Sequence, residues 1–178
     1  MKNLIFLFGI LLIMSCGGPK VLHRELAPGA DLSSYKTFDF FKTTAEGDTM
    51  AGHYADRFDK LKTAIVNELT AKGMKQTSDN PELLVNIGIV IDEQVQTRET
   101  NFNTDAPKYI GQRNYHWKSE EIEVGRYRLG TVTIHLVDAK KEELVWEGAV
   151  EGVVPDKESK RQKVINEGIH KLFEFEKN

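Results

Sequence analysis

Apolar and polar residues alternate along several stretches of the chain, and each alternation predicts a β-strand with one buried face. Within residues 35–41, Phe38 and Phe40 fall on the same face. The longest alternation covers residues 83–95, and its apolar positions are Leu83, Val85, Ile87, Ile89 and Ile91. We therefore expect strands at 35–41 and 83–95, with a shorter strand at 74–77.

Two further alternating runs, residues 128–138 and 143–154, are separated by a short polar turn, which predicts a β-hairpin. In the second run, Leu144, Trp146 and Val150 share one face. This pattern predicts that Trp146 is buried against the first helix of the domain.

Two segments show the spacing of amphipathic helices, with apolar residues three or four positions apart. The first covers residues 54–72 and ends before Gly73, a residue type that commonly terminates helices. Its apolar stripe is Phe58, Leu61, Ile65 and Leu69. The second covers residues 155–175, with Val164, Ile165, Ile169, Leu172 and Phe173. The order of elements predicts an α+β fold, a mixed or antiparallel sheet of about four to six strands with two helices packed on one face.

The first 15 residues have the pattern of an export signal. Lys2 gives a positive start, and residues 4–14 contain no polar side chain. A run of 11 residues is too short to span a bilayer as a helix, which needs about 20. A charged start followed by a short apolar run is typical of a signal peptide.

The signal ends in "LIMSCGG", which resembles the lipobox read by lipoprotein signal peptidase, and Cys16 is the only cysteine in the chain. We therefore expect cleavage before Cys16 and lipidation of that residue, with palmitate or a similar acyl group. Residues 16–33 contain several Gly and Pro residues, and we expect a flexible tether there, followed by one domain over residues 34–178. Gly17 does not resemble the aspartate that retains some lipoproteins in the inner membrane. The expected location is the outer membrane, facing the periplasm.

Composition excludes one class of partner. The 24 Lys and Arg residues and 27 Asp and Glu residues give a formal charge of −3, and loss of Lys2 with the signal makes it −4. This is not the balance of a nucleic-acid-binding protein.

The familiar signatures of catalysis and metal binding are missing from the sequence. The five histidines do not show metal-ligand spacing, and neither H-E-x-x-H nor G-x-S-x-G occurs. We expect no metal, no cofactor and no catalytic residue. Two weaker arrangements have plain alternatives. His135 and Asp138 are an acid/base pair, or His135 is simply a solvated histidine. Glu147 and Glu151 are paired carboxylates, or outward charges on an antiparallel strand.

The segment from Arg98 to Arg128 is longer than an ordinary connection and combines aromatic with cationic residues. Such side chains suit contact with a protein surface or a glycan. The residues with which we expect it to bind a partner are Tyr109, Arg113, Tyr115, Trp117 and Tyr127. The alternative is that part of the segment extends the flanking strands and covers the sheet edge.

Several phrases carry a family resemblance: "DLSSYKTFDF", "LTAKGM", "NPELLVNIGI" and "GTVTIHLVDAKKEELVWEGAV". Together, over about residues 31–173, they resemble the domain-of-unknown-function family 4136. The resemblance implies a lipoprotein of a Gram-negative envelope with an α+β fold. It implies no catalytic residue.

Two functions are compatible with these observations. The first is a membrane-anchored envelope lipoprotein without enzymatic activity, which binds or helps to assemble another envelope protein or a glycan. The second is a hydrolase or transferase that acts on cell-wall or outer-membrane material. A cluster of perturbed carboxylates around His135 in one cleft favours the second.

Overall fold

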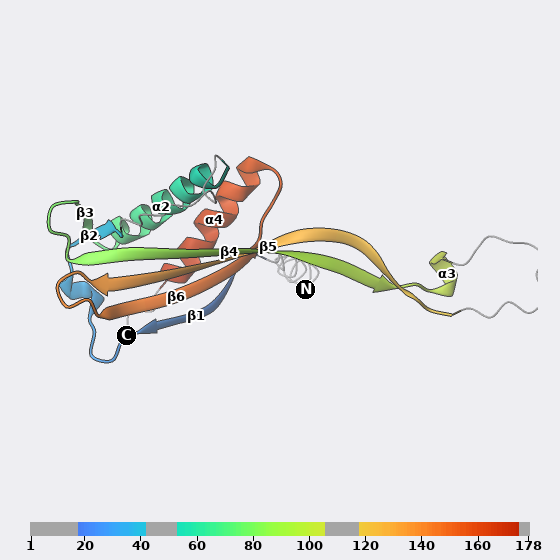
Figure 1. The fold of residues 1–178 in the computed structure, drawn as a ribbon, viewed down its shortest axis with the longest axis horizontal. Coiled ribbons are helices and arrows are strands. Elements are labelled where there is room, and N and C mark those ends of the chain that lie inside the picture. Colours follow the sequence, from blue (N-terminus) through green and yellow to red (C-terminus); the bar gives the residue numbers. More distant parts are fainter. Residues whose placement is uncertain (1–17, 42–52, 106–117, 175–178) are drawn as a thin grey trace, which may run out of the picture.

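The computed structural model describes residues 18–41, 53–105 and 118–174, which form one six-stranded sheet covered on one face by two helices (Figure 1). The strand order is β1-β6-β5-β4-β2-β3. The elements are β1 (Lys20–Leu26), η1 (Leu32–Ser34), β2 (Thr37–Phe40), α2 (His53–Ala71), β3 (Lys75–Gln76), β4 (Leu83–Glu99), α3 (Phe102–Asp105), β5 (Glu121–Asp138), β6 (Leu144–Val153) and α4 (Glu158–Phe173).

The sheet is mixed. Strands β4, β5, β6 and β1 pair antiparallel in succession, whereas β2 pairs parallel with β4 on one side and with β3 on the other. α2 joins the parallel strands β2 and β3, as such a connection requires. The predicted α+β fold with a mixed sheet and two helices is confirmed.

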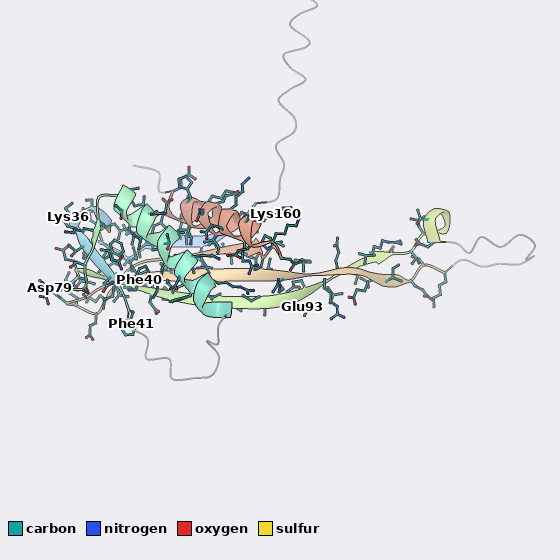
Figure 2. All side chains as sticks on the ribbon, turned by 90° about the horizontal axis from the view of Figure 1, so that it is seen from above. Lys36, Phe40, Phe41, Asp79, Glu93 and Lys160 are labelled. Atoms are coloured by element: carbon teal, nitrogen blue, oxygen red, sulfur yellow. The ribbon has the colours of Figure 1, made fainter. Side chains whose placement is uncertain are left out.

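The core lies between the sheet and the two helices, which lie side by side over it (Figure 2). Three members of the stripe predicted for α2 are buried: Leu61, Ile65 and Leu69. α4 contributes Ile169, Leu172 and Phe173. The sheet supplies Phe38, Leu83, Val85, Ile134, Leu136 and Trp146. Removal of this apolar surface from water is the main force that holds the layers together.

The segment expected to be a tether contains an edge strand. Residues Lys20–Leu26 of β1 pair with β6, and Pro19 just before them is buried. Arg24 extends from β1 to donate hydrogen bonds to the carbonyls of Lys171 (3.0 Å) and Glu174 (2.6 Å) at the end of α4. Backbone pairing and these bonds hold the strand, so it needs no apolar stripe and the sequence pattern does not reveal it. The expectation of a flexible tether over 16–33 is wrong for this part.

Trp146 is buried, as predicted, but its stacking partner is in the last helix. Its ring stacks on Phe173 of α4, with 5.0 Å between the centroids. Leu144, expected on the same face, is exposed. A β-bulge explains the difference: Leu136 pairs with Trp146 and Val137 with Leu144, which inserts one extra residue in β6 and turns Leu144 to the other face.

Gly148 makes room for this ring. A Cβ atom on Gly148 would lie 2.7 Å from Cη2 of Trp146 and 2.9 Å from Cδ1 of Leu172. Both neighbours are buried in the core, so neither can move away without disturbing its own contacts.

We therefore expect Gly148→Ala to lower the free energy of unfolding by about 1–3 kcal/mol, the usual cost of overpacking a core. The measurement is urea unfolding followed by circular dichroism. Gly88→Ala is the matched control, because a Cβ there would meet its nearest atom, Cβ of Thr133, at an ordinary 3.8 Å. Equal stability of the two variants would contradict the close approach at Gly148.

Candidate functional site

Strands β4 and β5 continue as a two-stranded ribbon beyond the rest of the sheet (Figure 1). The last residue of β6, Val153, lies opposite Leu129, and the backbone N–H of Val154 still donates to the carbonyl of Arg128 at 2.8 Å. Apart from that bond, residues 93–99 and 121–128 have only each other as strand partners in the described chain. We call these two stretches the arm. Seven residues of β4 and eight of β5 give it a length of about 23 Å. Figure 2 shows it leaving the body near Glu93.

The arm accounts for both ends of the long segment singled out in the sequence. Arg98 and Glu99 belong to β4, and residues 121–128 belong to β5. The alternative interpretation, in which the segment extends the flanking strands, is therefore correct for these ends. Of the residues expected to bind a partner, Tyr127 lies on the arm and is exposed. The others, Tyr109, Arg113, Tyr115 and Trp117, lie outside the described residues, as does Cys16.

Ion pairs organise the arm. Arg126 reaches Glu123 on its own strand (2.7 Å) and Glu93 on the opposite strand (3.5 Å). Near the far end, two nitrogens of Arg98 donate to the two carboxylate oxygens of Asp105 at 2.7 and 2.5 Å. These bonds from Arg98, followed by the bond from the backbone N–H of Asn101, hold the pKa of Asp105 far below its ordinary value. The short helix α3 is thereby fixed to the ribbon.

The arm also exposes apolar side chains. The exposed fractions are 49% for Val95, 46% for Val124 and 40% for Tyr127. Val95 is on the face of β4 that points to the helices, since it alternates with Leu83, whereas Tyr127 pairs with Gln94 on the opposite face. A two-stranded ribbon is only marginally stable in water, and solubility alone favours polar side chains on it. The apolar residues are thus available for contact with another molecule.

A polar cluster extends across β1, β6 and β5 on the sheet face that the helices do not cover. Glu147 of β6 lies between two histidines, with 3.8 Å from Oε1 to Nε2 of His23 and 3.7 Å from Oε2 to Nε2 of His135. Sequence reasoning missed His23 because β1 was not predicted. Within the described part of the chain, no group of three or more His, Cys, Asp or Glu residues is arranged to hold a metal ion.

His135 and Asp138 do not form an acid/base pair. They are three residues apart in β5, so they point to opposite faces of the sheet. Asp138 is buried, and it accepts hydrogen bonds from the backbone N–H groups of Lys140 and Lys141 and from the hydroxyl of Tyr35, each at 2.9 Å. These bonds lower the pKa of Asp138, and the bond from the backbone of Lys141 has the largest effect. Its carboxylate closes the β5–β6 turn and ties it to Tyr35.

Two other carboxylates have a similar structural role. Glu82 accepts hydrogen bonds from the backbone N–H groups of Lys36 and Thr37, and these bonds lower its pKa. The pKa of Asp31 is lowered by bonds from Ser33 at the start of η1. Both groups are therefore held as carboxylates in turns, far along the chain from His135.

A family model described as "Domain of unknown function (DUF4136)" matches residues 23–175. The chain belongs to the DUF4136 family. This confirms the resemblance noted in the sequence. No curated protein matches this DUF4136 chain.

A solved structure shares its fold. A PDZ domain protein from Parabacteroides distasonis aligns with a TM-score of 0.52 and 16% identity, over 90% of this chain and 37% of that one. The DUF4136 chain thus corresponds to only part of that protein, and at this identity the likeness concerns the fold alone. The PelC dodecamer from Paraburkholderia phytofirmans aligns with a TM-score of 0.42 and 12% identity, over 89% of this chain and 99% of that one.

The hydrogen bonds of Asp138 predict a pH-dependent stability difference. Because the pKa of Asp138 lies below its ordinary value of 3.8 in the folded state, its stabilising effect is complete well above pH 4. It is lost as the pH falls through the folded-state pKa. Asn does not titrate, so Asp138→Asn should lower the urea midpoint most at neutral pH, and the difference from wild type should shrink below about pH 4.

Tyr35→Phe is the companion variant, because it removes one bond to Asp138 and leaves the charge and both backbone bonds in place. It should show a weaker pH dependence of the midpoint difference. A difference in urea midpoint between wild type and Asp138→Asn that stays constant from pH 7 to pH 3 would contradict this role for the carboxylate.

Proposed function

We propose that this DUF4136 protein is a lipid-anchored component of a Gram-negative envelope that binds another envelope protein without catalysing a reaction. The arm is the observation that carries the proposal. It extends past every other strand of the described sheet and presents Val95, Val124 and Tyr127 to solvent. Exposed apolar residues grouped on one projecting element favour a binding role.

The outer edge of β4 gives this binding a mechanism. β2 pairs with β4 only along Leu83–Val85, so from Asn86 to Glu99 no described strand lies along that edge. An extended segment of a partner could add to the sheet there through backbone hydrogen bonds, with side-chain contacts providing specificity. The charged side chains of Asp92, Glu93 and Arg98 along the edge would oppose unselective pairing.

The enzymatic alternative has less support. It requires carboxylates with shifted pKa values close to His135 in one cleft. In the described residues, the carboxylates with shifted pKa values are Asp31, Glu82, Asp105 and Asp138, and each accepts hydrogen bonds from neighbouring backbone or side-chain groups in a turn or on the arm. His135 lies beside Glu147 on the open sheet face instead.

The anchor is supported by the sequence around Cys16. No helix in the described ranges is long and apolar enough to cross a bilayer. Lipid on Cys16 would provide attachment, since two or three acyl chains hold a protein stably at a membrane. With Gly17 after the cysteine, the proposed location is the outer membrane, facing the periplasm.

Replacement of the exposed arm residues should weaken partner binding. We expect the double variant Val95→Ser, Tyr127→Ser to recover about 30-fold less of the partner from crosslinked envelopes, since truncation of two interface side chains typically costs about 2 kcal/mol or more. Its thermal midpoint should stay close to that of wild type, because both side chains are exposed.

The matched control is Phe41→Ser, Leu144→Ser, which removes one exposed aromatic and one exposed aliphatic side chain from the body. It should retain the partner at wild-type levels. Equal losses in the two double variants, or none in either, would show that the arm is not the contact element.

Cys16→Ala tests the anchor. Because the variant lacks the thiol that would carry lipid, we expect either release into the soluble fraction or retention of the uncleaved signal. Membrane fractionation and the mass of the purified chain distinguish these outcomes from wild type. A cleaved variant that still fractionates with the outer membrane at wild-type levels would exclude lipid as the anchor.

A further inference from the structure

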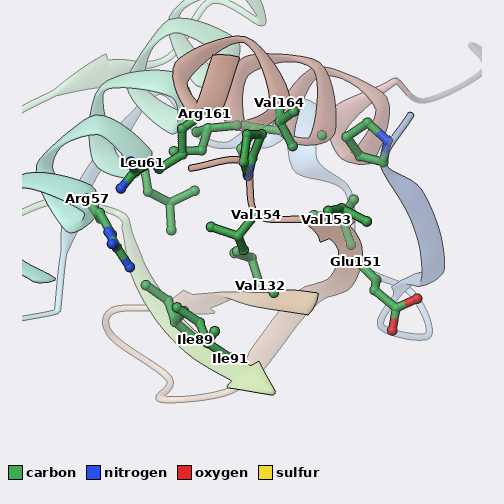
Figure 3. A pocket seen from close by; sticks show the side chains of 18 residues that line it. Arg57, Leu61, Ile89, Ile91, Val132, Glu151, Val153, Val154, Arg161 and Val164 are labelled. Atoms are coloured by element: carbon green, nitrogen blue, oxygen red, sulfur yellow. The ribbon is translucent and has the colours of Figure 1, made fainter. Parts of the chain in front are cut away.

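An apolar pocket of about 110 Å³ lies where the arm leaves the body, under the first turns of the two helices. Its floor is the helix-facing side of β4, β5 and β6, and its walls are α2, α4 and the β6–α4 connection. Figure 3 shows side chains of Ile89, Ile91, Val132 and Val154 around the space.

The pocket exists because glycines line it and because α2 and α4 both begin beside it. Gly130, Gly152 and Gly168 contribute no side chain to its walls. A Cβ on Gly130 would lie 2.9 Å from Cγ2 of Val154, so a larger residue there would push into the connection that forms one wall. At the mouth, Ile89 is 41% exposed and Val153 is 51% exposed. The apolar surface therefore continues from the pocket to solvent.

Two arginines stand along one side of this apolar space, Arg57 from the start of α2 and Arg161 from the start of α4 (Figure 3). Nη2 of Arg161 donates to the carbonyl of Asp156 at 2.8 Å, but its Nε is buried and has no hydrogen-bond partner. A buried N–H without an acceptor is costly. An acceptor inside the pocket would remove that cost.

The electrostatic environment at the N-terminal ends of α2 and α4 also favours an anion in the pocket. The N-terminus of a helix carries a partial positive charge, and a cation in its first turn adds to it. The two acidic side chains beside the start of α4 are already engaged, Glu158 by Lys60 and Asp156 by Arg128. The carboxylate of Glu151 points away from the pocket (Figure 3). Arg161 therefore places a positive charge beside the hollow that these acidic side chains do not take up.

We propose that this pocket binds an anionic single-chain amphiphile of the fatty-acid class, with the carboxylate at Arg161 and the hydrocarbon chain in the apolar space. The pocket is of the order of an engineered cavity of about 150 Å³ that holds benzene, so it would take about six carbons of the chain. The rest of the chain would continue over Ile89 and Val153 at the mouth. The inference does not depend on the arm or on the lipid at Cys16.

Photo-crosslinking tests the proposal with palmitic acid that carries a diazirine on its chain. The full-length chain with Cys16→Ala is used, so that no acyl group of its own competes, and crosslinked peptides are identified by mass spectrometry. We expect saturable crosslinking to peptides that contain β4 near Ile89 or the β6–α4 connection. Hexadecanol with the same diazirine should label at least tenfold less, because it lacks the carboxylate.

Variants separate the pocket from nonspecific adsorption. Arg161→Gln should reduce labelling by palmitic acid about tenfold, whereas Lys163→Gln, which removes a charge from an exposed position of the same helix, should not. Val132→Phe should fill the pocket and abolish labelling. Ile89→Trp blocks the mouth from a position exposed enough to tolerate the ring, so it gives the same readout if Val132→Phe does not fold.

Three results would overturn the proposal. They are labelling spread over the surface, labelling that Ile89→Trp and Arg161→Gln leave unchanged, and equal labelling by the acid and the alcohol. A pocket that is labelled only when Cys16 is replaced, and stays closed to the probe in the wild-type lipoprotein, would assign it to the protein's own acyl chain instead.

Discussion

Strands β4 and β5 pair through backbone hydrogen bonds along their whole length, from Leu83 opposite Asp138 to Glu99 opposite Glu121. The pairing has one register shift, near the far end. The other elements are placed by this pairing. Its first half provides the surface that α2 and α4 cover, and the edges on which β2 and β6 assemble. Its second half has no helix above it and becomes the arm. A single ladder thus joins the stable body to the element available for contact.

The sequence predicts well those elements that bury one face. The alternation from Leu83 to Ile87 and the stripe of Leu61, Ile65 and Leu69 exist because the core requires them, so periodicity finds β4 and α2. The same logic fails for elements that backbone bonds hold. β1 lies at an edge, and the outer part of β4, "EQVQTRE", is solvated on both faces. Neither needs a periodic apolar pattern.

Local irregularities account for the remaining differences. The bulge next to Trp146 reverses the face of Leu144, and nothing in the alternation of "ELVWEGAV" shows where an extra residue is inserted. The His23–Glu147–His135 cluster depends on the register of β1, β6 and β5, which brings together residues more than one hundred positions apart. The pocket depends on glycines and on where two helices begin. Of the candidate site, composition could indicate only that the segment between β4 and β5 was unusual.

The pairing of β1 with β6 also changes how the protein would be held at a membrane. With Pro19 packed into the body, only Gly17 and Gly18 separate the body from Cys16, a reach of about 10 Å. A lipid on Cys16 would then act as a short pivot, and the near side of the body would remain within about 10 Å of the headgroups. Pro19 also lines the pocket, so the anchor would keep the pocket near the bilayer surface, where molecules with acyl chains are most concentrated. Rotation about this pivot would limit the arm to a shell of fixed radius around the anchor, which raises its effective concentration toward partners attached to the same membrane.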